Sequence, residues 1–266
     1  MSNLLEYVSD INEELEKQNE IHAIYTDFSK AFDMVDFWPS CPKVVPRRTP
    51  SETRQDIVIG DKTFAAVHDF VYLGSLISDQ NEISAEICKR IMAANKCYFG
   101  LLRYFRSKLL SRNIKVLLYK TLLRPVLTYG SESWVLSKKD EDCLLVFERK
   151  ILRRIFGAVL ENRRWRTRYN HELYGMYKEP NVIKTIKLGR LRWAGHVARM
   201  DDNRAPLRLL DGKPDGRRNR GRPKLRWLDG VEQDLKTIDV KNWRTRAKDR
   251  DVWKKILDQA KAHSRL

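Results

Sequence analysis

The sequence has few of the residues from which zinc sites and disulfide frameworks are built. Its 266 residues include only four cysteines, with no Cys-x-x-Cys pair and no histidine cluster near them: Cys41, Cys88, Cys97 and Cys143. This spacing argues against a structural zinc site and against a disulfide framework, and it is typical of a reducing, intracellular compartment.

Long apolar runs are also missing. The longest apolar window, residues 116–129, is interrupted by Lys120, Arg124 and Pro125, so it does not predict a membrane span. The N-terminus is acidic and has no apolar signal core. We therefore expect a soluble, intracellular protein with no membrane partner. Hydrophobic residues make up 42% of the chain, which is enough for one or two domains with a core.

The sequence does contain one short motif that suits a metal-dependent enzyme. Residues 24–33, Ile-Tyr-Thr-Asp-Phe-Ser-Lys-Ala-Phe-Asp, read as an apolar strand that delivers Asp27, followed by a turn into a helix. A carboxylate at the end of a strand can hold Mg²⁺ through its oxygens. A two-metal site needs several carboxylates, so Asp27 alone is not sufficient.

This motif resembles the first catalytic motif of reverse transcriptases from LINE-type (non-LTR) retrotransposons. Further stretches extend the resemblance in that family's order. Residues 70–75 resemble the strand at the end of the palm, residues 118–130 the thumb, and residues 190–200 and 221–227 the C-terminal tail. The resemblance covers nearly the whole chain and implies descent from an RNA-directed DNA polymerase.

The resemblance also implies which catalytic parts are absent. Asp27 would be the first metal ligand, and Phe32 would screen the sugar of the incoming nucleotide. The intact family holds Mg²⁺ with two further aspartates in a Tyr/Phe-Ala-Asp-Asp hairpin, a tetrapeptide that this sequence lacks. Its only Asp-Asp pair, Asp201-Asp202, has no flanking apolar strands and reads as a solvated helix end. We expect no cofactor and no polymerase activity in the chain as it stands.

A proline-rich stretch occupies the place of the missing palm segment. Residues 38–55 include four prolines between positions 39 and 50, which should exclude a regular helix or a central strand. An ordinary surface loop has the same composition. We favour a deletion or splice junction, because such a linker inside a palm would separate strands that should pair.

Charge is distributed unevenly along the chain. Residues 1–80 carry 7 Lys and Arg against 14 Asp and Glu, a net charge of −7, and residues 81–266 carry 45 against 21, a net charge of +24. The two parts together give the +17 of the whole chain. Basic charge concentrated in the part that resembles thumb and tail predicts binding of RNA or DNA.

Three clusters of cations are candidates for this binding. The first lies on a predicted helix over residues 138–156, whose apolar stripe is Leu144, Phe147, Ile151 and Ile155. The other faces carry four cations that repel one another unless phosphates, or an acidic patch of the N-terminal part, neutralise them: Arg149, Lys150, Arg153 and Arg154.

The second cluster interleaves arginines with aromatic residues over positions 163–169: Arg163, Arg164, Trp165, Arg166, Arg168 and Tyr169. Arginines can bridge phosphates while Trp165 or Tyr169 stacks on an unpaired base. The alternative is a tryptophan that fixes a helix to the core, with solvated arginines beside it.

The third cluster lies in a Gly/Pro/Arg linker and its continuation: Arg217, Arg218, Arg220, Arg222 and Lys224. The segment Arg220–Lys224 resembles an AT-hook and also a nuclear-localisation cluster, so a nuclear location is one prediction. A flexible, solvated linker between helical pieces is the alternative.

Hydrophobic periodicity predicts an α+β fold, a small remnant palm sheet followed by a mostly α-helical thumb and C-terminal region. The sheet should come from residues 21–27 and 56–73, with a hairpin over 57–65. One long helix is predicted over 83–109, a second from Ser111 until Pro125 kinks or ends it, and others over 180–200 and 240–262.

The predicted organisation has seven segments: 1–37 as a palm-like piece with the first motif, 38–55 as the Pro-rich junction, 56–80 as end-of-palm strands, 81–136 as thumb-like helices, 137–210 as a basic helical region, 211–223 as a linker, and 224–266 as C-terminal helices. The predicted function is a transposon-derived reverse transcriptase fragment, inactive as a polymerase, that binds RNA, DNA or both; no small-molecule substrate is indicated. Two alternatives remain: an incomplete gene model of an active enzyme, and a host-used basic module with an acidic protein partner.

Overall fold

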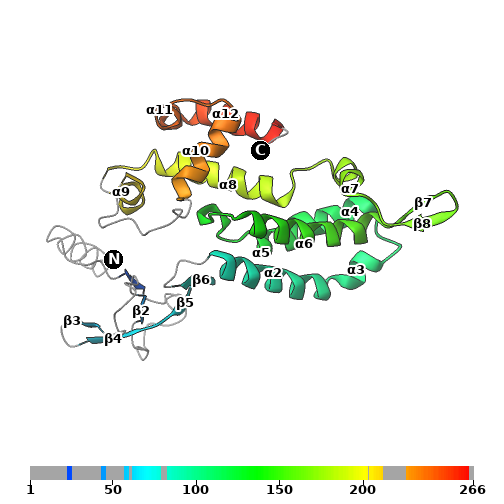
Figure 1. The fold of residues 1–266 in the computed structure, drawn as a ribbon, viewed down its shortest axis with the longest axis horizontal. Coiled ribbons are helices and arrows are strands. Elements are labelled where there is room, and N and C mark those ends of the chain that lie inside the picture. The colour runs from blue at the N-terminus through cyan, green and yellow to red at the C-terminus, as the bar shows by residue number, and fades with distance from the viewer. Residues whose placement is uncertain are drawn as a thin grey trace. The chain divides into compact units, whose positions relative to one another are not determined.

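The protein divides into two compact units, Met1–Glu86 and Ile87–Leu266. The computed structural model describes residues 67–78, 83–202, 204–211 and 226–263, together with the backbone of short strands at 23–25, 43–45, 57–59 and 62–66. Most of the strands fall in the first unit, and the described part of the second is helical apart from one hairpin (Figure 1). The predicted α+β class, a small sheet followed by a helical bulk, is confirmed.

A four-stranded sheet in the order β1-β2-β4-β3 forms part of the first unit. β1 (Ala23–Tyr25) pairs antiparallel with β2 (Lys43–Val45), which runs parallel to β4 (Lys62–Ala66). β3 (Ile57–Ile59) pairs antiparallel with β4, which confirms the predicted pairing across 57–65. The expectation that 38–55 holds no central strand is wrong. β2 lies between β1 and β4, since Pro42 and Pro46 flank its three residues without removing any of their N–H groups.

A second, two-stranded sheet turns within the stretch expected to be a single strand at 70–75. β5 (Asp69–Tyr72) and β6 (Ser75–Ser78) pair antiparallel, with Tyr72 opposite Ser75. Leu73 and Gly74 both have positive φ angles, 46° and 84°, which is the backbone of a type I′ hairpin turn. The side chain of the buried Glu86 accepts a hydrogen bond of 2.7 Å from the backbone N–H of Leu76.

The long helix predicted over 83–109 is interrupted. α2 (Ile83–Gly100) ends at a glycine, a poor helix former, and α3 (Leu102–Arg106) follows as a short helix. Of the apolar residues at helical spacing in this stretch, Ile87, Ala94, Tyr98 and Phe105 are buried, whereas Ile83, Ile91 and Leu101 are half-buried. Leu109 is 96% exposed, because Ser107 adopts extended backbone angles and the helix has ended before it.

The next helical path passes through Pro125 rather than ending there. Ser111 caps α4 (Arg112–Leu118), as its side chain accepts a hydrogen bond from the backbone of Ile114. A π-helical segment, η2 (Tyr119–Leu123), leads directly into α5 (Arg124–Leu127). Pro125 falls in the first turn of α5, where a missing N–H costs least. A short 3-10 turn, η3 (Ser131–Ser133), follows.

α6 (Lys138–Phe156) has the bounds predicted from the sequence. Ser137 and Asp140 form a reciprocal capping box at its start, and Gly157, with φ of 73°, follows its last residue. The predicted stripe is buried along its whole length: Leu144, Phe147, Ile151 and Ile155. This helix therefore supplies a central face of the core in the second unit.

After α6 the chain forms a hairpin that projects beyond the helices (Figure 1). Its strands are β7 (Val159–Glu161) and β8 (Arg164–Arg166). The chain then continues into α7 (Asn170–Tyr177), α8 (Val182–Val197) and α9 (Ala205–Asp211). Asp201 and Asp202 are exposed after α8, as predicted for a solvated helix end.

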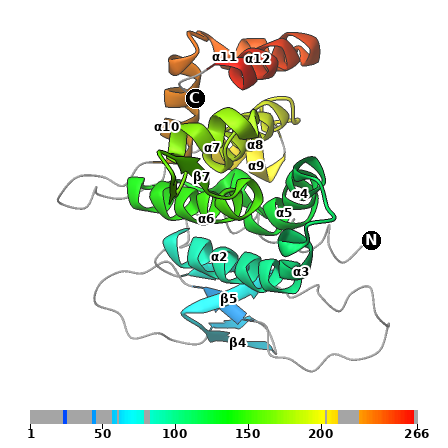
Figure 2. The ribbon, with the colours of Figure 1, turned by 90° about the vertical axis from the view of Figure 1, so that its right-hand side faces the viewer.

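The C-terminal helices pack against α8, which lies between them and α6 (Figures 1 and 2). They are α10 (Trp227–Thr237), α11 (Trp243–Lys248) and α12 (Arg250–Ala262). A single helix was expected over 240–262, but Asp249 interrupts it and caps α12 by accepting from two backbone N–H groups. The apolar residues that should face the core along 240–262 are buried: Trp243, Ala247, Trp253, Ile256 and Ala260.

Candidate nucleic-acid interface

The projecting hairpin exposes an apolar pair. Leu160 on β7 lies directly opposite Trp165 on β8, and their side chains therefore share one face of the hairpin. Trp165 is 73% exposed and Leu160 55% exposed. The alternative in which Trp165 fixes a helix to the core does not describe this structure. A large ring held on a projecting strand is instead open to a flat partner.

The turn of the hairpin places a cation at its tip. Asn162 and Arg163 connect the strands and both have positive φ angles, 49° and 63°, as a type I′ turn requires. Arg163 and Arg164 are exposed. Arg164 pairs with Glu161 across the strands, so its side chain projects from the face opposite to Trp165. The tip thus combines a bare indole ring with two solvated guanidinium groups.

Arg166 holds the hairpin to α7 rather than facing solvent. Its Nη1 and Nη2 donate to the two carboxylate oxygens of Glu172 at 2.9 and 2.8 Å, and its Nε donates to Glu161. The hydrogen bonds from Arg166 lower the pKa of Glu172 to about 2, and the two carboxylates raise the pKa of Arg166. Arg166 was predicted to bind nucleic acid, but two acids already occupy its guanidinium.

Tyr169 adds a second exposed ring at the base of the hairpin. It is 59% exposed, and the Arg166 guanidinium lies 4.4 Å from its ring centroid. Its ring also stacks on His171, with centroids 5.8 Å apart and planes at 13°. Arg168, half-buried beside it, has a buried Nε with no hydrogen-bond partner among the residues described. We call the exposed residues Leu160, Arg163, Arg164, Trp165 and Tyr169 the hairpin surface.

The four cations of α6 do not form one patch. Lys150 donates to Asn95 of α2 at 3.3 Å and lies 5.7 Å from the ring centroids of two aromatic residues there. Arg153 donates to Asn170 at the start of α7, at 2.8 Å. Arg149 is half-buried, and Arg154 is exposed. Arg153 and Arg149 both contact α7, Arg153 through Asn170 and Arg149 through Tyr174, whereas Lys150 contacts α2.

A buried carboxylate lies on the opposite side of α6. Glu148 is fully buried and accepts hydrogen bonds from the hydroxyls of Tyr119 and Tyr174, at 2.9 and 3.1 Å, and from the backbone of Val182 at 3.1 Å. Burial raises the pKa of Glu148, and the nearby carboxylate contributes to raising the pKa of both tyrosines. These contacts join α6 to η2, α7 and α8, so Glu148 acts in packing.

Several predicted site residues lie outside the described residues. These are Asp27 and Phe32 of the catalytic motif, and the linker cations Arg217, Arg218, Arg220, Arg222 and Lys224. In the described ranges, no group of three or more His, Cys, Asp or Glu side chains could hold a metal ion. No helix in those ranges has the length and apolar character needed to cross a bilayer.

The hairpin itself was not predicted, although the sequence carries a signal for it. Residues 159–166, Val-Leu-Glu-Asn-Arg-Arg-Trp-Arg, place Asn162 between Val159-Leu160 and Trp165, residue types that are common in strands. Asparagine tolerates the left-handed backbone of hairpin turns better than most residues. The strands were not predicted because three of the eight residues are arginines, and arginine is not a typical strand residue.

The chain matches no family model and no solved structure. It is similar to a transposon-derived protein of Caenorhabditis elegans, with 29% identity over 197 residues that cover 72% of this chain and 70% of that protein. The similarity supports a transposon origin for the chain.

Proposed function

We propose that this chain descends from a LINE-type reverse transcriptase, has lost polymerase activity and binds RNA or DNA through the hairpin surface. The transposon-derived relative and the ordered resemblance of five stretches support the descent. The exposed Trp165 is the observation that carries the proposed binding. The Trp165 side chain is 73% exposed, so most of its apolar ring surface is in contact with water, and a base stacked on the ring would cover that surface.

The preferred partner is an unpaired strand. Stacking of a base on an aromatic ring contributes about 1–3 kcal/mol and tolerates any base, whereas bases inside a duplex are already stacked. Arg163 at the tip and Arg164 on the opposite face of the hairpin are exposed, and both can attract the phosphates of a strand whose base stacks on Trp165. Binding should therefore be independent of sequence and strongly dependent on salt.

Replacing Trp165 tests the stacking. Trp165→Ala should weaken binding of a single-stranded oligonucleotide by roughly 5- to 150-fold, the equivalent of about 1–3 kcal/mol. Trp193→Ala on α8 is the matched control, as it removes a tryptophan that is partly exposed but far less so. Fluorescence anisotropy with a labelled oligonucleotide measures both. If the two variants lose affinity equally, the hairpin surface is not the binding site.

The salt dependence separates the charges from the ring. Replacing Arg163 and Arg164 together by alanine should reduce the slope of log K against log salt by about 1.4 for a single strand. The double variant Lys254→Ala with Lys255→Ala removes the same charge from exposed positions on α12 and should leave the slope nearly unchanged. Wild-type affinity that is indifferent to salt would point to an acidic protein partner.

The loss of polymerase activity has its own test. Because Asp27 is the only residue in a metal-binding context that the resemblance provides, the purified chain should not extend a primer on an RNA or DNA template with Mg²⁺ or Mn²⁺. Asp27→Ala is the control. Primer extension by the wild type that disappears in this variant would show that the site is active.

A further inference from the structure

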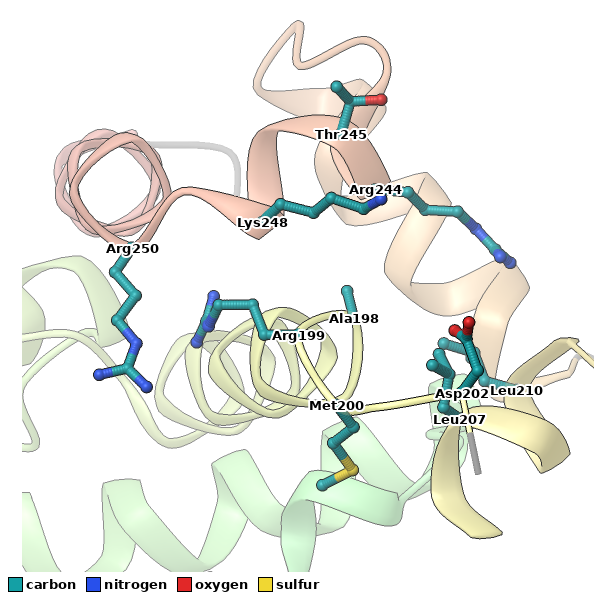
Figure 3. A pocket seen from close by; sticks show the side chains of 10 residues that line it. All are labelled: Ala198, Arg199, Met200, Asp202, Leu207, Leu210, Arg244, Thr245, Lys248 and Arg250. Carbon is teal, nitrogen blue, oxygen red and sulfur yellow. The ribbon is translucent and has the colours of Figure 1, made fainter. Parts of the chain in front are cut away.

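A basic cavity lies at the end of α8, away from the hairpin surface. Its volume is about 590 Å³, within the range of small-molecule sites in proteins. The cavity is lined by the segment that follows α8, by α9, by α11 and by the first residue of α12. Four of the lining residues are cations and one is an acid: Arg199, Arg244, Lys248, Arg250 and Asp202 (Figure 3).

The cations reach the cavity from different directions. Figure 3 shows Arg250 and Arg199 on one side, and Arg244 with the Asp202 carboxylate on the other. Lys248 extends from the end of α11 toward the Arg244 side. The single acid therefore lies away from the Arg199–Arg250 side, and the cavity as a whole keeps an excess of positive charge.

Arg199 is held in place while most of its donors remain available. Its Nη1 donates to the backbone carbonyl of Ala247 at 2.7 Å, which fixes the guanidinium near the end of α11. A guanidinium has five N–H donors, so four are left by this bond. Partial burial and the neighbouring charge of Arg250 both lower the pKa of Arg199, as expected of two cations that face each other. No ion pair joins Arg199, Lys248 or Arg250 to an acid among the residues described.

The cavity also has apolar lining. Leu207 and Leu210 of α9 lie on the side of Asp202, and Ala198 lies beside Arg199 (Figure 3). A ligand that combines a multiply charged anionic group with a flat or apolar body would match both parts. Phosphate is the anion whose oxygens suit several guanidinium and ammonium donors at once.

We propose that this cavity binds a terminal phosphate group, carried by a nucleotide-sized molecule. The recognising groups are Arg199, Lys248 and Arg250, which line the cavity, and the dianionic charge of a terminal phosphate matches their combined positive charge better than the single charge of a backbone phosphate. Two sources share this chemistry, a free nucleotide and the phosphorylated end of a nucleic-acid strand. The site does not depend on the hairpin surface, which recognises bases and backbone.

Titration calorimetry on the full chain at low salt tests the proposal with ATP as the probe. Lys248→Gln and Arg250→Gln should each weaken ATP binding about tenfold, since a charge-assisted hydrogen bond of this kind is worth about one decade in affinity. Lys254→Gln is the matched control, because it removes one exposed cation of α12 that does not line the cavity. Trp165→Ala should leave ATP binding unchanged. Inorganic pyrophosphate should displace ATP, and adenosine should not.

A pair of oligonucleotides distinguishes the two sources. If ATP binds with this pattern, a free nucleotide is a ligand. If ATP does not bind, but a 5′-phosphate raises the affinity of an oligonucleotide over its 5′-hydroxyl counterpart and Arg250→Gln removes that gain, the strand end is the ligand. The proposal is overturned if neither probe shows a contribution that depends on Lys248 or Arg250, if Lys254→Gln causes an equal loss, or if adenosine binds as well as ATP.

Discussion

Glu148 offers a stability prediction whose size follows from the contacts of one side chain. The carboxylate is fully buried between α6, η2, α7 and α8, and it accepts three hydrogen bonds, from the hydroxyls of Tyr119 and Tyr174 and from the backbone of Val182. Replacing it by alanine removes all three acceptors and leaves a cavity. Replacing it by glutamine keeps the shape and one acceptor oxygen.

The two variants should differ widely. An unsatisfied buried donor costs about 1–3 kcal/mol, and the Val182 N–H cannot turn away to another partner because it belongs to the backbone. Glu148→Ala should therefore lower the free energy of unfolding by about 3 kcal/mol or more, a large part of the roughly 5–15 kcal/mol of a typical protein. Glu148→Gln should cost much less, since the Tyr119 hydroxyl can rotate to accept from the new amide.

The raised pKa of Glu148 also predicts how the free energy of unfolding changes with pH. Burial raises the pKa of Glu148 above its ordinary value of 4.5, so the folded protein binds a proton more tightly than the unfolded chain does. The stability that this group contributes is fully present below pH 4.5 and is lost as pH rises through the folded pKa. Glu148→Gln cannot titrate and should lack this component of the decline.

Urea unfolding followed by far-UV circular dichroism, from pH 4.5 upward, measures both effects. The difference in unfolding free energy between Glu148→Gln and wild type should grow in favour of the variant as pH rises. A difference that stays constant over this range would refute the assigned pKa shift. An alanine variant as stable as wild type would refute the importance of the three hydrogen bonds.

Two further predictions concern other parts of the second unit. Gly195→Ala should lower the free energy of unfolding in urea by about 1–3 kcal/mol, because the new Cβ would lie 2.0 Å from the Trp253 ring nitrogen. Gly175→Ala in α7 is the control: its Cβ meets nothing within 4 Å, so it should stabilise the protein by about 0.5–1 kcal/mol. Equal effects of the two substitutions would contradict the close packing of α12 on α8. Glu172, whose pKa is lowered to about 2, holds the hairpin through Arg166, and this contribution is present above about pH 4.5 and lost as pH falls through 2. Amide hydrogen exchange of 159–166 should therefore accelerate in Glu172→Gln at pH 7, and unchanged exchange would show that the hairpin is held otherwise.

Local signals account for what could be predicted of the fold. α6 was predicted at its observed bounds from an apolar stripe that repeats at helical spacing, and the structure shows that Ser137 caps its start and Gly157 follows its end. The buried faces of the C-terminal helices followed from the same periodicity. The predicted catalytic residues cannot be compared in this way, as Asp27 and Phe32 lie outside the described residues.

The structure differs from the predictions made from the sequence where tertiary contacts outweigh the local sequence pattern. The central strand β2 is only three residues long and is set between prolines, so its pairing depends on β1 and β4 rather than on its own sequence. Arg166 looked equivalent to Arg164 in a basic run, yet Glu161 and Glu172 occupy it once the hairpin folds. The burial of Glu148 could not be predicted from neighbouring residues, since the partners that allow it are up to 34 residues away in the sequence.

The arrangement of α8 has a consequence for synthesis of the chain on the ribosome. One face of α8 packs against α10, α11 and α12, through a core that includes Leu191, Val231 and Trp253. The 66 residues that follow Val197 up to His263 must therefore be translated before that face can be buried. At ~5–20 residues per second this takes roughly 3 to 13 s. During that interval the nascent chain presents an apolar helix surface to chaperones and to neighbouring chains, so translation of the last helices sets the period in which the protein is most prone to aggregate.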